Sequence, residues 1–220
     1  EIQRRDGRDV YFDSIPTTLV HRFTLNGAEI EYQDQGEVPG TILNQFSMDE
    51  NGSIFRIATS TDSYDPRTGS TSWNNLYLLN KDSMTVTGKI EKIAPGEHIK
   101  SVRFVGDRAY MVTFKNVDPL FVIDIADASN PKILGKLKIP GWSDYLHPYD
   151  ETHLIGFGRE VNPKAELSEF LKPDMLMGMK LSIFDVADVA NPKEMFKEVI
   201  GARGTTSELL TNHKALLFDK

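Results

Sequence analysis

Leu120–Lys132 reads LFVIDIADASNPK and Leu181–Lys193 reads LSIFDVADVANPK, and these two segments align without a gap. They lie 61 residues apart, and seven of the thirteen positions are identical. A weaker third copy, LYLLNKDSMTVTGK, runs from Leu76 to Lys89. Repetition of this kind indicates a chain built from equivalent structural units.

A glycine marks the start of each unit. It occurs in VPGTILN (Gly40), APGEHIK (Gly96), IPGWSDY (Gly141) and IGARGTT (Gly201), at intervals of 56, 45 and 60 residues. We take the shortest interval as the basic unit, so that the other two carry insertions of 11 and 15 residues. The insertions are expected at Asp62–Asn74 and Arg159–Gly178.

The 45-residue unit divides into four short segments rich in β-branched and aromatic residues, each bounded by Gly, Pro, Asp or Asn. They are Ile99–Gly106, Arg108–Phe114, Leu120–Ala126 and Ile133–Pro140. Helical repeats are excluded because sustained i, i+3, i+4 apolar spacing is absent. A four-strand unit every ~40–50 residues is typical of a propeller blade. The sequence therefore predicts an all-β fold, a β-propeller of four-stranded antiparallel blades.

Counting strands gives an N-terminal extension (1–16) and a propeller domain (17–220). The domain is expected to contain a half-blade (17–39), three complete blades (40–95, 96–140 and 141–200) and a second half-blade (201–220). The first half-blade would consist of strands Leu19–Leu25 and Glu29–Val38, and the last of strands Ser207–Thr211 and Ala215–Asp219. The chain stops inside the strand-like segment KALLFDK, as expected for a fragment.

The two half-blades leave three arrangements open. They could close on each other as a composite fourth blade, which removes exposed edges. The chain could instead be part of a larger propeller, which is the preferred interpretation, or two chains could complete one ring through their open half-blades.

Composition narrows the function classes. The chain has 25 basic and 32 acidic residues, a net charge of −7, and its dispersed Lys and Arg form no stripe for nucleic-acid phosphates. The absence of cysteine excludes disulfides, thiolate zinc sites and cysteine nucleophiles. No segment approaches the ~18 apolar residues of a membrane span, and the first ten residues, EIQRRDGRDV, contain no apolar signal core.

The segments GEHIKSVRFVGDRAYMVTF, VDPLFVIDIADASNPKILG, YLHPYDETHLIGFG and NHKALLFDK resemble the secreted β-propeller domain family of bacteria and archaea, which is distantly related to WD repeats. The resemblance covers nearly everything after about Thr17. It implies export, an extracellular or cell-surface location, and no established activity. The stretch NPKAELSEFLKPDMLM departs from the family pattern, so nothing is carried over there.

Propeller geometry places the second-to-third and fourth-to-first connections on one face, and both expected insertions fall there. Because loops on a rigid scaffold often carry function, we expect the binding surface on this long-loop face. Its candidate residues are Tyr64, Asp65, Arg67, Trp73, Glu97, His98, Asp118, Trp142, Asp144, Arg159 and Glu160. Trp73 could instead be packed between blades, and Trp142 is the better candidate for exposure. His98 resembles the histidine of the WD-repeat Gly-His pair, which implies a structural hydrogen-bonding role.

The second insertion is expected to form a short helix, with Asn162 as its cap and Pro173 at its end. Its apolar stripe and the methionines that follow could form a lid over a ligand or dock onto the propeller rim.

Patterns typical of catalysis, metal binding or cofactor binding are weak or missing. His147, Asp150 and His153 straddle a predicted hairpin, and Asp49–Gly52 lacks the remaining acids of an EF-hand loop. Dinucleotide, phosphate-loop and hydrolase motifs are also absent. We therefore assign no catalytic residue, metal site or cofactor.

Three functions remain. The first is a non-enzymatic extracellular propeller that binds a protein, peptide or glycan. The second is a cell-envelope enzyme acting on polysaccharide or peptide, with Asp118 and Asp144 converging at the channel mouth. The third is a structural or assembly module of a larger surface protein.

Overall fold

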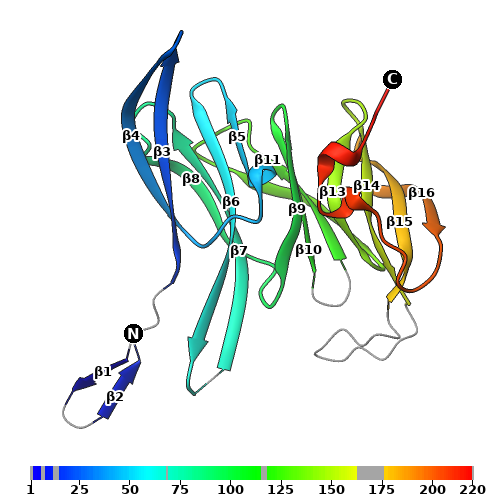
Figure 1. The fold of residues 1–220 in the computed structure, drawn as a ribbon, viewed down its shortest axis with the longest axis horizontal. Coiled ribbons are helices and arrows are strands. Elements are labelled where there is room, and N and C mark those ends of the chain that lie inside the picture. The colour runs from blue at the N-terminus through cyan, green and yellow to red at the C-terminus, as the bar shows by residue number, and fades with distance from the viewer. Residues whose placement is uncertain are drawn as a thin grey trace. The chain divides into compact units, whose positions relative to one another are not determined.

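Antiparallel strand ladders make up almost all regular structure in the computed structural model of the protein (Figure 1). The structure describes residues 2–5, 8–11, 15–67, 69–114, 118–162 and 176–219. Three four-stranded sheets follow one another along the chain, with strand orders β5-β6-β7-β8, β12-β11-β10-β9 and β13-β14-β15-β16. Two hairpins, β1-β2 and β3-β4, precede them. The predicted four-strand unit is thus confirmed.

The hairpins are β1 (Ile2–Arg5), β2 (Arg8–Tyr11), β3 (Thr17–Asn26) and β4 (Glu29–Pro39). The first sheet contains β5 (Met48–Asn51), β6 (Ile54–Asp65), β7 (Gly69–Asn80) and β8 (Val86–Ile93). The second contains β9 (His98–Val105), β10 (Arg108–Phe114), β11 (Asp118–Asp124) and β12 (Lys132–Ile139). The third contains β13 (Trp142–Pro148), β14 (His153–Val161), β15 (Leu176–Asp185) and β16 (Lys193–Ile200). The described residues also contain the short 3-10 helices η1 (Gln45–Ser47), η3 (Glu208–Leu210) and η4 (His213–Ala215).

The chain divides into two compact units, Glu1–His98 with Ala128–Asn130, and Ile99–Asp127 with Pro131–Lys220. Unit 1 holds the hairpin β3-β4 and the sheet β5–β8. Its core consists of Val38, Ile57, Tyr77, Leu79 and Met84. Tyr77 and Leu79 alternate along β7 and therefore point to the same side of the sheet, whereas Met84 lies in the connection between β7 and β8. Val20 of β3 packs against this core, so the hairpin is anchored on the first sheet through one face.

Unit 2 has a larger core, shared by its two sheets. Tyr110, Val112 and Val122 come from the β9–β12 sheet, and Leu146 and Phe184 come from the β13–β16 sheet. All five are at most 3% exposed. Burial of apolar surface at ~25 cal/mol per Å² makes this shared core the main source of stability in unit 2.

The repeated glycines have a common backbone conformation. Gly40, Gly96, Gly141 and Gly201 have φ angles of 94°, 85°, 81° and 72°. Residues with a Cβ rarely adopt this left-handed region, so glycine is favoured where the chain turns from one four-strand unit into the next. The sequence marker therefore reflects a repeated backbone requirement.

The first expected insertion is ordered as strand. β6 and β7 remain paired from Ile54↔Asn80 to Asp65↔Gly69, so Asp62–Asn74 forms a two-stranded ribbon closed by a short turn. The expectation of a long connecting loop is wrong here. The polar Ser- and Thr-rich sequence hides the strands because it lacks apolar alternation.

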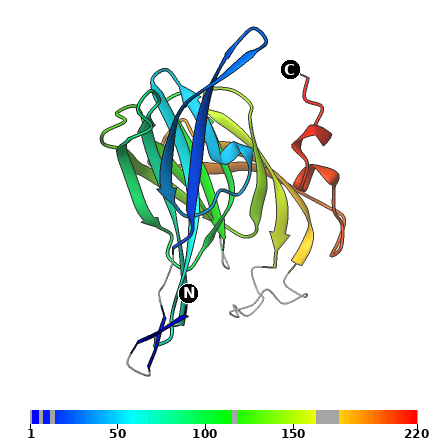
Figure 2. The same cartoon turned by 60° about the vertical axis from the view of Figure 1, so that its left-hand side comes forward.

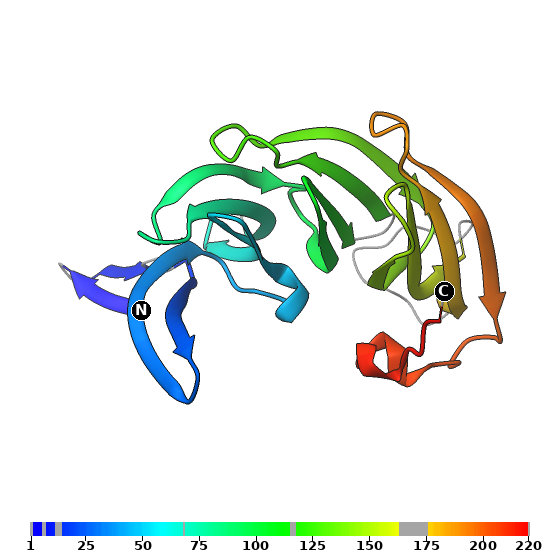
Figure 3. The ribbon, with the colours of Figure 1, turned by 90° about the horizontal axis from the view of Figure 1, so that it is seen from above.

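The prediction of two strands at Ser207–Thr211 and Ala215–Asp219 is also wrong. This region contains η3 and η4, drawn in red in Figure 3. The Ser207 side chain accepts a hydrogen bond from the Leu209 amide, and the Asn212 side chain accepts one from the Lys214 amide. These caps satisfy amides that a strand would direct to a neighbouring strand.

Two other segments bear on the expected boundaries. The helix expected after Asn162 falls on residues 163–175, outside the described residues. The extension 1–16 includes the hairpin β1-β2, with Ile2 paired to Tyr11. Among the described residues, no helix has the length and apolar character needed to cross a membrane.

Candidate functional site

A buried asparagine fixes the base of the β6-β7 ribbon in unit 1. The Asn74 side chain accepts a hydrogen bond from Ser60 Oγ at 2.7 Å and donates to the carbonyls of Ile93 and Glu97 at 3.2 and 3.1 Å. The Gly96 amide donates to the Ser72 carbonyl at 2.7 Å. The loop that contains Gly96 and Glu97, called the glycine loop below, is therefore attached to the ribbon by main-chain and side-chain hydrogen bonds.

His98 adds a further contact at this base. Its Nε2 lies 2.7 Å from Asp62 Oδ1, and both side chains are exposed. This contact ties the first residue of β9 to the ribbon. Asp62 was not among the candidate residues, although its place in the insertion could have suggested it.

The outer part of the ribbon presents the exposed candidates. Tyr64 is 56% exposed, and Arg67 is exposed in the turn. Asp65 Oδ1 accepts a hydrogen bond from the Arg67 amide at 2.7 Å, which fixes the turn. Trp73 is only half-buried, so part of its ring remains accessible. Six candidates thus belong to the ribbon and glycine loop of unit 1, namely Tyr64, Asp65, Arg67, Trp73, Glu97 and His98. The ribbon strands β6 and β7 are labelled in Figure 1.

Trp142 in unit 2 is buried, so the expectation that it is the more exposed tryptophan is wrong. It begins β13 rather than lying in a loop, and it is 6% exposed. Its ring packs on Phe114 with 4.4 Å between centroids, and its Nε1 donates to Asp144 Oδ1 at 2.7 Å. The apolar side chains around it account for the burial.

Asp144 lies in an unusual electrostatic environment. Burial raises the pKa of its carboxyl group, while the Trp142 hydrogen bond and the charges of Lys100 and Arg159 lower it by a smaller amount. Lys100 Nζ stands 5.4 Å from the Trp142 ring centroid, which is a cation–π distance. Lys100 was missed because a single lysine in a strand carries no sequence signal.

Arg159 and Glu160 have different interaction partners. Arg159 pairs with Trp142 across the β13-β14 ladder and donates to Thr205 O at 3.1 Å and Thr206 Oγ1 at 3.3 Å. Glu160 is buried and forms an ion pair with Lys197 at 2.9 Å. The structure therefore brings Trp142, Asp144 and Arg159 together, whereas Glu160 interacts elsewhere. Asp118 begins β11 opposite Ile139, and its side chain lies outside the described part.

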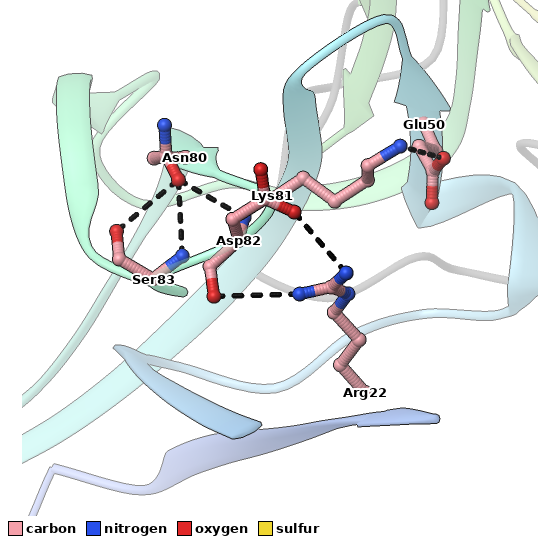
Figure 4. Close-up of polar contacts among 6 residues, drawn as sticks. All are labelled: Arg22, Glu50, Asn80, Lys81, Asp82 and Ser83. Carbon is pink, nitrogen blue, oxygen red and sulfur yellow. Dashed lines mark hydrogen bonds and ion pairs between the residues drawn. The ribbon is translucent and has the colours of Figure 1, made fainter. Parts of the chain in front are cut away.

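Unit 1 also contains a hollow that the sequence did not indicate. It has a volume of about 190 Å³, and its apolar lining includes Val20, Phe55 and Met84. Arg22 and Lys81 also line it. Arg22 Nη2 pairs with Asp82 Oδ1 at 3.1 Å, and Lys81 Nζ pairs with Glu50 Oε1 at 2.9 Å (Figure 4).

The turn that carries Asp82 and Ser83 is held by Asn80. Its Oδ1 accepts hydrogen bonds from the Asp82 and Ser83 amides at 2.9 and 3.0 Å (Figure 4). The hollow is below the ~300–1,000 Å³ of typical small-molecule pockets. It could therefore hold a single side chain more readily than a cofactor.

The histidines of the β13-β14 hairpin have different partners. His147 Nδ1 lies 3.2 Å from Tyr145 Oη, whereas His153 Nδ1 lies 2.9 Å from Asp150 Oδ1. Across the described residues, no group of three or more His, Asp and Glu side chains could hold a metal ion. The arrangement offers ion pairs and aromatic surface rather than a set of metal ligands.

Comparison with known proteins gives a family match over residues 12–220, to the beta propeller domain. An uncharacterized protein of Archaeoglobus fulgidus is 38% identical over 207 residues, which cover 93% of this chain and 28% of that protein. The uncharacterized protein MJ1554 of Methanocaldococcus jannaschii is 38% identical over 187 residues, covering 85% of this chain and 27% of that protein. The chain spans less than a third of the length of either relative. Because the family match extends over almost all of the sequence, the chain belongs to the beta propeller domain family.

Proposed function

We propose that the protein is a non-enzymatic binding module that recognises a protein, peptide or glycan through the β6-β7 ribbon and the adjoining glycine loop. The observation that carries this proposal is an exposed ribbon tip on a rigid base. Asn74 and Gly96 fix the base, while Tyr64 and Arg67 are exposed. Preorganised loops lose less conformational entropy on binding than mobile ones.

The chemistry of the tip favours a partner with both apolar and hydrogen-bonding surface. Tyr64 and the accessible part of Trp73 offer aromatic faces, which stack on sugar rings or apolar side chains. Arg67 offers a planar set of donors suited to carboxylates. Tyr, Trp and Arg are the residues most enriched among binding hot spots. The family resemblance supports an extracellular or cell-surface partner.

The experiment measures binding of the 220-residue chain to arrays of envelope glycans and peptides. The test variants are Tyr64→Ala, Arg67→Ala and a shortened ribbon in which an Asn-Gly turn joins Thr61 to Trp73. Glu29→Ala, on an exposed hairpin of the same unit, is the control. We expect at least tenfold weaker binding for the ribbon variants and unchanged binding for the control. Equal binding by the shortened ribbon would contradict the proposal.

A catalytic alternative is favoured by one observation, the raised pKa of the Asp144 carboxyl group beside Lys100 and Arg159. Carboxyl groups with raised pKa values serve as general acids in many hydrolases. Turnover of envelope polysaccharide or peptide by the intact chain, abolished in Asp144→Asn or Asp118→Asn, would support an enzyme. Absence of turnover in the intact chain would exclude the catalytic alternative.

A further inference from the structure

The hairpin β3-β4 in unit 1 carries an apolar face that the rest of the described chain leaves uncovered. Five large side chains are at least half exposed, with fractions of 56% for Leu19, 54% for Phe23, 74% for Leu25, 71% for Ile30 and 50% for Tyr32. The tip of the hairpin also projects beyond one end of the β5–β8 sheet of its own unit (Figures 1 and 2). Exposed apolar clusters of this kind mark interaction surfaces.

These five side chains share one face of the hairpin. Phe23 pairs with Tyr32 and Leu25 pairs with Ile30, and directly opposed residues of an antiparallel pair point to the same side. Leu19 lies on that side too, because it is four positions before Phe23 in β3 and alternate residues of a strand point to the same side. The Phe23 and Tyr32 rings are 5.5 Å apart in an edge-to-face arrangement. We call this set of five residues the outer face.

The opposite face of the same hairpin is different. Near the base it packs on the first sheet through Val20 and Val38. Near the tip it presents Thr24, Glu29 and Glu31, all exposed. The tip therefore has a polar, negatively charged side and an apolar side without charge. Only the apolar side is suited to burial, because like charges on the other side would repel each other.

We propose that the outer face of β3-β4 is a self-association surface, on which a second copy of this chain packs face to face through the same five residues. A two-fold arrangement places each apolar patch against its equivalent, because an isologous interface uses one surface twice. Two twisted sheets pack in this way about 10 Å apart. Toward the base of the hairpin the same face also carries exposed polar side chains, because His21 pairs with Gln35 and Leu19 pairs with Glu37. The continuous apolar cluster is therefore Phe23, Leu25, Ile30 and Tyr32, with Leu19 beyond the polar pair.

The apolar area alone comes close to what a specific interface needs. At roughly 150 Å² for each large side chain, the exposed fractions leave about 450 Å² of apolar surface per copy. A pair would then bury about 900 Å² before the polar side chains are counted, close to the ~1,000 Å² expected of a specific interface. We therefore expect a dimer that forms reversibly with concentration. The proposal involves neither the ribbon nor the glycine loop, so it does not depend on the proposed function.

Light scattering and analytical ultracentrifugation of the 220-residue chain test the stoichiometry. Leu25→Asp and Ile30→Lys alter the outer face, and Thr24→Asp and Glu31→Lys are matched controls on the polar face. Because Leu25 and Ile30 are more than 70% exposed, substituting them removes little intramolecular packing. We expect a dimer whose dissociation constant rises at least tenfold in the outer-face variants and changes less than twofold in the controls. A chain that stays monomeric at high concentration would overturn the proposal.

Cross-linking tests the geometry. The chain has no cysteine, so Leu25→Cys or Thr24→Cys introduces the only thiol. Face-to-face packing predicts a disulfide-linked dimer for Leu25→Cys and little for Thr24→Cys, with a Leu19→Cys variant as a second position on the outer face. Equal cross-linking at Leu25→Cys and Thr24→Cys would indicate pairing through the strand edge and would refute face-to-face packing. Circular dichroism of each variant checks that the fold is retained.

Discussion

His147 couples protonation to the stability of unit 2. Burial, followed by the positive charge of Arg103, lowers the pKa of its imidazole. The folded state therefore binds this proton less readily than the unfolded state, whose histidine pKa is about 6.5. Stability is highest above that pH and decreases as the pH falls below it, because the unfolded state takes up the proton first.

We predict that the free energy of unfolding decreases from pH 7.5 to pH 5.5. The decrease over this range should be smaller in the His147→Gln variant. Urea denaturation at four pH values measures both slopes. His98→Gln is the control, because it removes an exposed histidine outside unit 2. Equal slopes for His147→Gln and the parent chain would contradict the assignment.

Ionisation of the buried Asp144 carboxyl group lowers the stability of the folded protein. Its raised pKa means that burial disfavours the ionised form more than Trp142, Lys100 and Arg159 favour it. Asn accepts the same Trp142 hydrogen bond without a charge. We therefore predict that Asp144→Asn raises the melting temperature at pH 7 by up to about 3 °C. The increase should vanish at pH 3, where the parent carboxyl is largely protonated. A lower melting temperature at pH 7 would show that the two cations outweigh burial.

The sequence predicted that Trp142, Asp144 and Arg159 lie near one another. It did not reveal that Trp142 is buried. A tryptophan after Pro-Gly resembles a loop residue, and only the tertiary packing on Phe114 reveals that it is buried. Lys100 was missed for a related reason. Its role depends on its 5.4 Å distance from the Trp142 ring, and residues 42 positions apart in the chain carry no mutual signal in one sequence.

The β13-β14 ladder leaves no room for a side-chain atom at Gly158. A Cβ at Gly158 would lie 1.8 Å from the Trp142 carbonyl oxygen, a backbone atom that cannot move aside without disrupting the ladder. We predict that Gly158→Ala destabilises unit 2 by at least about 3 kcal/mol. Gly52→Ala is the control, because Gly52 has φ +61° but open space around its Cβ position, and about 1 kcal/mol is expected. Chemical denaturation compares the two, and similar losses would contradict the steric argument.

Strand edges show a second contrast between elements. The outer strands β8, β12 and β16 carry lysines or alternating Lys and Glu, which discourage pairing with other chains. β3 reads TTLVHRFTLN and has neither Lys, acidic residues nor Pro. Among the described strands it pairs only with β4. The edge of β3 is thus weakly protected, and pairing through this edge is the alternative to packing through the outer face that cysteine cross-linking distinguishes.

For the whole molecule, the repeat was enough to predict the sheets. The glycine marker and the β-branched and aromatic segments bounded by Gly, Pro, Asp or Asn are local features, so β9 to β12 were predicted to within about two residues of their bounds. The β6-β7 ribbon and the 3-10 helices η3 and η4 were not predicted. In the ribbon, main-chain pairing stabilises strands without apolar alternation. In η3 and η4, side-chain caps outweigh β-propensity because no strand pairs with that segment in the described residues.

The division into two units predicts separable stability. The unit 1 core includes Ile57, the unit 2 core includes Leu146, and both side chains are fully buried. Ile57→Ala and Leu146→Ala should each cost about 2–5 kcal/mol through lost burial and cavity formation. Because a repeat protein is stabilised mainly by interactions within a unit and between nearest neighbours, each substitution should accelerate amide exchange chiefly in its own unit. Hydrogen exchange with peptide-level mass spectrometry compares β5–β8 with β13–β16 in both variants. Uniform acceleration over all three sheets in either variant would show instead that the chain unfolds as a single cooperative body.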